Sequence, residues 1–423
     1  MRSARIAYFC ELRYPLIMLG PVTSTGCGWL RAGREIFPAM LEAIEAARVS
    51  VRLEIYTCSP GPLAVRFLAA LAAAQERGAS VRVMVDAVGS IDLPETFWDP
   101  LRGAGGEARQ FNPLSLNRFG IRDHRKLLVC DEQTAIIGGF NIAQEYDGDG
   151  VTSGWCDVGL KLTGAVVAEL AAAFDEMFAR VDFRHKRFMR LRKFGAKKII
   201  EGPEERLLLS GPGRGPSPIK RALRRDLTQA QRVQIIVAYF LPTRRLRRAL
   251  ARVARRGGRV QLILPGKSDV LVSQLAAQSL YRRFLKAGVE ICEYQPQVLH
   301  AKLFIIDDVV YVGSANLDQR SLNINYELMI RFENRQLAEQ AREIFADTLQ
   351  RCEPITFEQW RQSRTLWRRL KQRWAYFLLV RIDPAVARRQ WKALGGWRKD
   401  RVPRDEERVM RDPPSSDFGA TSP

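Results

Sequence analysis

One pattern of polar residues occurs twice in this chain, and it constrains the fold more than any other feature. The segment HRKLLVCDEQTAIIGGFN starts at His124, and HAKLFIIDDVVYVGSAN starts at His300. In each copy a lysine follows the histidine by two positions and an aspartate by seven, and a Gly-Gly-x-Asn or Gly-Ser-x-Asn group ends the pattern. The chain has only 3 histidines, and 2 of them lie in this pattern. We therefore expect two halves built on the same plan.

The segments around the pattern also correspond between the halves. Strand-like runs at 49–58 and 232–242 are each followed by a helical segment and a second strand-like run. After the pattern, the strand-like segment 155–164 corresponds to 325–334. Apolar runs that alternate with amphipathic helices are typical of α/β sheets, so both halves are predicted to be α/β.

The composition along the chain predicts the domain boundaries. A stretch rich in glycine and proline separates the two halves, and the last residues are polar and rich in proline and serine. We expect an N-terminal extension, a first domain, a linker, a second domain, a basic aromatic C-terminal segment and a disordered tail, at 1–28, 29–200, 201–218, 219–352, 353–402 and 403–423 respectively.

The chain is strongly basic, with 67 Lys and Arg residues against 46 Asp and Glu residues and a formal net charge of +21. This balance predicts a polyanionic partner, either nucleic acid or an anionic lipid surface, and does not choose between them. The 7 cysteines form no Cys-x-x-Cys pair, which argues against a zinc site or a disulfide framework and suits a reducing compartment. No apolar run reaches the roughly 20 residues of a membrane-spanning helix, and we find no signal peptide.

The pattern predicts groups suited to chemistry at phosphorus on one face of each motif strand. Side chains two positions apart on a strand point the same way, so His124 lies with Lys126 and His300 with Lys302. If the two strands meet, one imidazole can attack phosphorus and form a covalent phosphohistidine. The other can protonate the leaving alcohol and then deprotonate the incoming one. The lysines would stabilise the developing charge, and no metal is expected.

Further polar residues are expected to complete this site. Asn141, Ser314 and Asn316 end the two patterns and are predicted to bind phosphate oxygens. Asp157 and Glu327 occupy matching places after the patterns. We predict that they orient the histidines, because an imidazole nucleophile is usually held through its second nitrogen by a carboxylate.

The two aspartates of the pattern, Asp131 and Asp307, are counted with the catalytic residues because they belong to the motif. For both we favour a structural role, in which the carboxylate holds the turn after the motif strand. The histidines and lysines remain the groups expected to act on the substrate.

The duplicated pattern HxKxxxxD with GGxN or GSxN resembles the phospholipase D superfamily. Within it, the segments RDHRKLLVCD, IGGFNIAQEY, VAYFLP, LILPGKSD and LHAKLFIID are similar to bacterial cardiolipin synthases, above all to the N-terminally short type called cardiolipin synthase B. The resemblance extends over residues 29–380.

This resemblance implies two pseudo-symmetric phospholipase D-like α-β-α sandwich domains with the active site at their interface. It also implies a phosphatidyltransferase that needs no metal or cofactor and converts two phosphatidylglycerol molecules to cardiolipin and glycerol. In the superfamily the histidine of the first motif is taken as the nucleophile. By that resemblance His124 would attack phosphorus, and His300 would act first as acid and then as base.

The C-terminal segment offers a way to reach a lipid substrate. Trp360, Trp367 and Trp374 recur every seven residues and are surrounded by arginine and lysine. This composition is typical of a helix that lies in the plane of a membrane, although such tryptophans could instead pack on the catalytic domains. We favour the membrane, and expect a peripheral protein on the cytoplasmic face of the cell membrane. Phosphatidylglycerol is the expected substrate, with phosphatidylethanolamine as a further candidate.

Other functions stay open on the same residues. Water in place of the acceptor alcohol would make the enzyme a phospholipase D-type hydrolase, and a nucleic-acid phosphodiesterase would use the same chemistry. A non-catalytic lipid binder would have no need for both intact motifs. The aromatic residues form a helical stripe rather than a row along a groove, so no nucleic acid is expected. Both half-sites lie in one chain, so a monomer is sufficient for the active site.

Overall fold

The computed structural model describes residues 25–112, 120–181, 197–213, 215–362 and 365–385. The first half forms a sheet in the order β1-β7-β6-β5-β2-β3-β4. Its strands, in chain order, are β1 (Gly26–Arg31), β2 (Ser50–Ile55), β3 (Ser80–Asp86), β4 (Glu107–Phe111), β5 (Leu127–Cys130), β6 (Thr134–Gly138) and β7 (Val158–Thr163).

The second half repeats this sheet and adds a strand at each edge, in the order β16-β12-β11-β10-β13-β14-β15-β9-β8. Its strands are β8 (Lys198–Glu201), β9 (Glu205–Ser210), β10 (Arg232–Val237), β11 (Arg259–Pro265), β12 (Glu290–Tyr294), β13 (Lys302–Ile306), β14 (Val309–Gly313), β15 (Glu327–Glu333) and β16 (Cys352–Pro354). The motif strands β5 and β13 occupy the same central place in the two sheets. The predicted duplication and α/β class are therefore confirmed.

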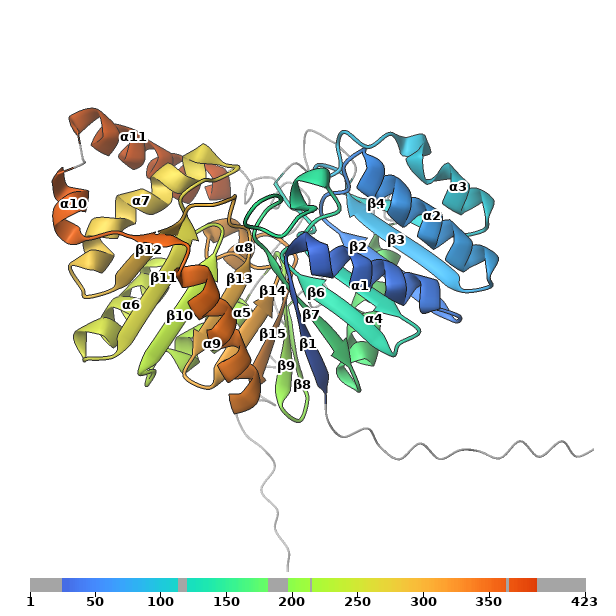
Figure 1. The fold of residues 1–423 in the computed structure, drawn as a ribbon, viewed down its shortest axis with the longest axis horizontal. Coiled ribbons are helices and arrows are strands. Elements are labelled where there is room, and N and C mark those ends of the chain that lie inside the picture. The colour runs from blue at the N-terminus through green and yellow to red at the C-terminus, as the bar shows by residue number, and fades with distance from the viewer. Residues whose placement is uncertain (1–24, 113–119, 182–196, 214, 363–364, 386–423) are drawn as a thin grey trace, which may run out of the picture.

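Helices cover both faces of each sheet, as Figure 1 shows. The helices are α1 (Ala32–Ala46), α2 (Pro62–Glu76), α3 (Asp99–Gly103), α4 (Val166–Arg180), α5 (Pro218–Asp226), α6 (Arg244–Arg255), α7 (Leu271–Leu285), α8 (Gln319–Asn323), α9 (Arg335–Leu349), α10 (Phe357–Gln362) and α11 (Leu366–Phe377), of which α10 and α11 pack on α7. Strand β5 shows why two layers form, because its side chains alternate between the faces. Leu128 packs in the cluster with α1 and α2, whereas Leu127 and Val129 pack in the cluster with α4.

The two domains share part of one core. Leu160 and Leu162 of β7 lie in the same buried cluster as Leu207 and Leu209 of β9 and Leu328 of β15. Burial of apolar side chains contributes about 25 cal/mol for each Å² removed from water, so this cluster holds the two sheets together. The shared core fixes the relative position of the two motif strands.

The structure corrects two predicted boundaries. Residues 205–210, expected in a linker at 201–218, form strand β9 between β8 and β15. The glycines and prolines around this segment favoured a linker, but its three leucines are buried on both faces of the sheet. Residues 26–28, expected in the N-terminal extension, belong to β1. Residues 1–24 of that extension and the predicted tail at 403–423 lie outside the described residues.

The predicted tryptophan stripe divides into two environments. Trp360 of α10 is 4% exposed and packs against Tyr281 with a ring-centroid distance of 4.9 Å. Trp367 and Trp374 of α11 are 74% and 62% exposed. The first tryptophan therefore belongs to the core of the second domain, and only the other two remain available to a membrane. No helix among the described residues is long and apolar enough to span a bilayer.

Replacing a leucine of β9 tests whether this segment is part of the core. Leu208 is fully buried, so Leu208→Ala should lower the stability of the fold by about 2–5 kcal/mol through lost burial and a cavity. Thermal unfolding followed by circular dichroism measures the effect. Ile199→Ala on the edge strand β8, where the side chain is 37% exposed, is the control and should shift the midpoint much less. Equal small shifts for both variants would contradict the assignment of β9 to the core.

Candidate active site

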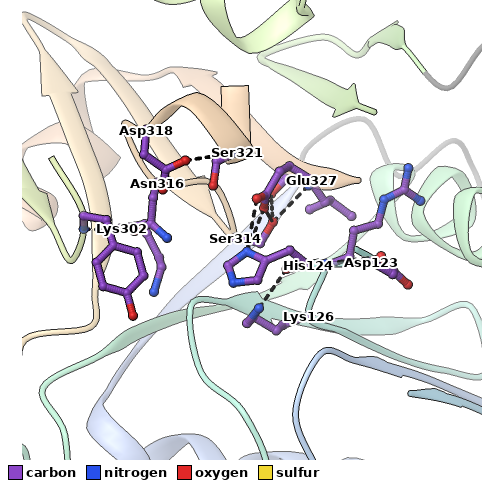
Figure 2. Close-up of polar contacts among 12 residues, drawn as sticks. Asp123, His124, Lys126, Lys302, Ser314, Asn316, Asp318, Ser321 and Glu327 are labelled. Atoms are coloured by element: carbon purple, nitrogen blue, oxygen red, sulfur yellow. Dashed lines mark hydrogen bonds and ion pairs between the residues drawn. The ribbon is translucent and has the colours of Figure 1, made fainter. Parts of the chain in front are cut away.

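The first histidine is held by the second domain. His124 lies just before β5, and its backbone N–H donates to the carbonyl of Tyr326 at 3.0 Å. The next residue, Glu327, is fully buried and its carboxylate lies 3.1 Å from Nδ1 of His124 (Figure 2). With Nδ1–H donated to this carboxylate, Nε2 is left with its lone pair.

The second histidine is held by the first domain in the same way. The backbone N–H of His300 donates to the carbonyl of Cys156 at 2.7 Å, and the carboxylate of Asp157 lies 2.8 Å from Nδ1. The predicted partners of the histidines are thus in contact with them, but the pairs cross between the domains. Neither domain alone contains a complete His–carboxylate pair.

Both motif lysines are buried beside the histidines. Lys126 donates to the carbonyl of His124 at 2.8 Å, and Nζ of Lys302 lies 2.6 Å from Nδ1 of His300. Burial lowers the pKa of Lys126 to about 7 and that of Lys302 to about 8. A phosphate anion between them would favour the charged ammonium groups and so raise these pKa values again. The lysines therefore suit an anionic substrate.

The two carboxylates differ in their protonation. Burial raises the pKa of Asp157 to about 7, although Lys302 opposes this shift. Burial also tends to raise the pKa of Glu327, but His124, Lys126 and the hydroxyl of Ser314 outweigh it and lower the pKa. Burial lowers the pKa of both histidines below the ordinary value. Near neutral pH the Asp157–His300 pair therefore holds an additional proton more often than the Glu327–His124 pair does.

The three residues predicted to bind phosphate have different surroundings. Oδ1 of Asn141 accepts from the backbone N–H of Thr57 at 3.1 Å, and Oδ1 of Asn316 accepts from that of Tyr239 at 3.3 Å. These bonds leave the amide nitrogens as the donors, of which that of Asn141 already gives one hydrogen to the hydroxyl of Tyr146. Ser314 donates its only hydroxyl proton to Glu327 at 2.5 Å. Ser314 therefore supports the carboxylate, and its hydroxyl proton is directed to Glu327 rather than toward a phosphate.

The motif aspartates lie at the far ends of their strands from the histidines. Asp131 follows β5 and accepts backbone N–H groups of residues 48, 49 and 50 at 2.8–2.9 Å. Asp307 follows β13 and accepts those of residues 231 and 232, at 3.0 Å and 2.8 Å. Both have positive φ, of 54° and 49°, at the tight turn after the strand. Their carboxylates therefore hold the turn after the motif strand, which is the structural role favoured for both.

Two aromatic residues near His300 were missed by the sequence analysis. The hydroxyl of Tyr146 lies 3.3 Å from Nε2 of His300 and accepts from Nδ2 of Asn141 at 2.8 Å. The Trp155 ring lies 5.6 Å from the His300 ring. A search for repeated residues could not find them, because the matching positions in the second half hold Ser321 and Asn325.

The arrangement places two imidazoles and two buried lysines at the interface between the domains. No group of three or more His, Cys, Asp or Glu side chains suited to a metal ion occurs among the described residues. One imidazole with a free Nε2 can attack phosphorus, and a second with a proton to give can assist the leaving group. The site therefore suits transfer of a phosphodiester through a covalent intermediate.

The family model described as cardiolipin synthase, PLD-like domain, matches residues 40–178 and 223–349, with one motif in each segment. The two segments together make up more than half of the chain. The chain belongs to this family.

Individual relatives agree with this family. Cardiolipin synthase B of Shigella flexneri is 30% identical over 89% of this chain and 93% of its own length. Cardiolipin synthase 1 of Bacillus cereus is 31% identical, over 71% of this chain and 62% of its own length. The crystal structure of phosphatidylserine synthase from Haemophilus influenzae matches with a TM-score of 0.67 and 16% identity, over 85% of this chain and 94% of that one. At that identity the likeness shows the fold, two phospholipase D-like domains.

Removing the carboxylate of Asp131 separates a structural from a catalytic role. Asp131→Ala leaves three backbone N–H groups without their acceptor and should cost about 1–3 kcal/mol of stability. Turnover per folded molecule should be unchanged, because the carboxylate is separated from His124 by the length of β5. Thermal unfolding and a phosphodiester transfer assay measure the two effects, with the exposed Asp92→Ala as control. Loss of turnover at full stability would restore Asp131 to the catalytic set.

Proposed function

We propose that this protein is a cardiolipin synthase that transfers a phosphatidyl group from one phosphatidylglycerol to the hydroxyl of another. One observation carries the proposal above the others. Each histidine of the duplicated motif is held by a carboxylate of the opposite half, so a single chain assembles both halves of a two-histidine phosphodiester site. The names of the curated relatives support phospholipids as the substrate class.

In the first step, Nε2 of His124 attacks the phosphorus of phosphatidylglycerol. A P–N bond forms, and the P–O bond to the glycerol headgroup breaks. His300 gives its Nε2 proton to the departing glycerol oxygen. The product of this step is free glycerol and a phosphatidyl group held covalently on His124, with Lys126 and Lys302 stabilising the charge on the nonbridging oxygens.

In the second step, the headgroup hydroxyl of another phosphatidylglycerol enters. His300 removes the proton of that hydroxyl, and the oxygen attacks phosphorus while the P–N bond to His124 breaks. Cardiolipin leaves, and both histidines return to their starting state. Protons balance over the cycle, because the one given to glycerol is recovered from the second lipid. No metal or cofactor takes part in either step as written.

The surroundings of the two histidines support this division of roles. Glu327 has a lowered pKa, so it stays ionised and holds His124 by Nδ1–H with Nε2 ready to attack. The raised pKa of Asp157 leaves an additional proton in the pair with His300 near neutral pH. The side chain of His124 is also more open than that of His300, at 12% against 4% exposure. A nucleophile must be reached by phosphorus, whereas an acid needs a proton to give.

The proposed lipid substrate and the surface of α11 also indicate where the enzyme works. Phosphatidylglycerol resides in a bilayer, and the exposed tryptophans Trp367 and Trp374 and the basic helices near them support attachment at an anionic surface. The proposal is a peripheral protein on the cytoplasmic face that is active as a monomer. Phosphatidylethanolamine remains a candidate second substrate.

Purified protein with EDTA and phosphatidylglycerol vesicles should form cardiolipin and an equal amount of glycerol. His124→Ala or His300→Ala should lower the rate at least about 10³-fold, because each step needs both imidazoles. Mass spectrometry of lipids and a glycerol assay give the two readouts, and Asp92→Ala is the control. Phosphatidic acid as the sole lipid product would make the protein a hydrolase. A parallel sample with phosphatidylethanolamine tests that lipid as substrate.

A phospholipid with a p-nitrophenyl headgroup distinguishes nucleophile from acid. Nitrophenolate needs no proton to leave, so His300→Ala should still release one equivalent in a burst and then stall without its base. The phosphatidyl group should then be found on the peptide that contains His124. His124→Ala should give no burst. A burst from His124→Ala, with the label on His300, would exchange the two roles.

A further inference from the structure

Two adjoining cavities lie on the second domain, outside the catalytic centre. Their volumes are ≈ 550 Å³ and ≈ 760 Å³, and both are lined by Arg244, Arg247 and Tyr376. Helices α6, α7 and α11 form the first cavity, and α5 and α6 supply half of the residues that line the second. Figure 1 shows α11 lying along α7 at the top of the second domain. The catalytic histidines and lysines line neither cavity.

The walls of these cavities are basic and carry no acidic residue. The first is lined by five arginines, Arg244, Arg247, Arg248, Arg283 and Arg373. Helices α6, α7 and α11 contain no Asp or Glu at all. Among the described residues, no carboxylate forms an ion pair with any of these five guanidinium groups. The cavities therefore lack an internal counter-charge.

One of these arginines is buried without a partner for part of its charge. Arg247 is 7% exposed, and its Nε has no hydrogen-bond acceptor. Its guanidinium lies 5.6 Å from the centre of the Tyr376 ring, which cannot neutralise it. A buried cation is costly unless it is paired and hydrogen-bonded. An anion in the cavity would supply what Arg247 lacks.

The second cavity has the same electrostatic character. Lys220 lies on its wall, and the pKa of this lysine is lowered, first by burial and then by Lys197, Arg245 and Arg224. Positive charges close enough to disfavour one another attract a shared anion. Arginine forks match the oxygens of a phosphate in pairs, so a phosphate is the anion this wall would recognise best.

The surface beside the cavities is apolar. Five exposed side chains of α11 share this character: Leu366, Trp367, Leu370, Trp374 and Phe377. A phospholipid meets both needs, with its phosphate among the arginines and its acyl chains near these side chains. A nucleic acid would stack on the tryptophans but would gain nothing from the leucines. The lipid is therefore the occupant that the whole surface favours.

We infer that these cavities form a second, non-catalytic site for the phosphate of an anionic phospholipid, which seats the enzyme on an anionic bilayer. The inference rests on the proposed function only in taking a lipid bilayer as the place of work. Each basic residue near an anionic leaflet adds to the attraction, so the exposed members of this wall control binding.

Flotation of the full chain with vesicles tests the inference without turnover, in the His124→Ala background. Arg248→Gln with Arg283→Gln removes two exposed cations of the wall. This variant should bind vesicles of phosphatidylcholine with phosphatidylglycerol at least about tenfold more weakly than the parent. Pure phosphatidylcholine vesicles should bind weakly in every case. Circular dichroism checks that the variant is folded.

Arg66→Gln with Arg282→Gln is the matched control, because it removes the same charge from exposed positions that do not line the cavities. If the control weakens vesicle binding equally, the effect comes from net charge alone and the proposed site is overturned. Arg247→Met should weaken binding as well, and normal binding of that variant would also count against it. A loss of oligonucleotide binding with unchanged vesicle binding would replace the lipid by nucleic acid.

Cardiolipin formation is measured separately with the wild-type protein. If vesicle binding depends on the cavity arginines but no cardiolipin forms, the proposed function is rejected and the second, non-catalytic phosphate site is kept. If the wild-type protein forms cardiolipin but the cavity variant and its control bind vesicles equally well, the second site is rejected and the proposed function is kept. The two ideas therefore fail in different experiments.

Discussion

The active site depends on an exchange of carboxylates between the two domains. Glu327 of the second domain holds His124 of the first, and Asp157 of the first holds His300 of the second. Burial makes both contacts strong but also makes them costly to break, because a buried carboxylate without its partner is heavily penalised. The same exchange that orients the imidazoles therefore also ties the domains together. Separation of the domains would remove the catalytic geometry and the stability of the interface at once.

Within this symmetric frame the two half-sites are chemically different. Ser314 donates to Glu327, whereas the matching position in the first half is Gly139. A Cβ atom at Gly139 would lie 2.6 Å from Oδ1 of Asp157 and 2.8 Å from Cδ of Lys302, so the first half has no room for a serine there. The extra donor helps to keep Glu327 ionised, and its absence leaves Asp157 easier to protonate. Small differences between the copies thus support the opposite roles proposed for two similar histidines.

The sequence predicted the parts of the site that occur twice. The histidines, lysines, asparagines and the two orienting carboxylates all lie at matching positions, so one copy supports the other. Tyr146 and Trp155 have no counterpart in the second half and give no such signal. Strand β9 was missed for a related reason, since its counterpart in the first sheet, β1, shares only the apolar pattern, and the flanks of β9 are rich in glycine and proline. The pairing of each carboxylate with the histidine of the other domain depends on how the domains pack. It cannot be predicted from the spacing of residues along the chain.

The excess of positive charge is distributed unevenly over the structure, which the composition alone could not reveal. In the first domain Arg52 and Arg82 are both paired with Asp175, and Arg331 of the second is paired with Asp226. Helices α6, α7 and α11, by contrast, hold arginines that no acidic residue of those helices can neutralise. Charges of one sign on neighbouring helices destabilise a fold, so their presence together implies a compensating anion outside the chain. Because the proposed substrate is itself an anionic lipid, the membrane surface to which the enzyme binds can supply that anion.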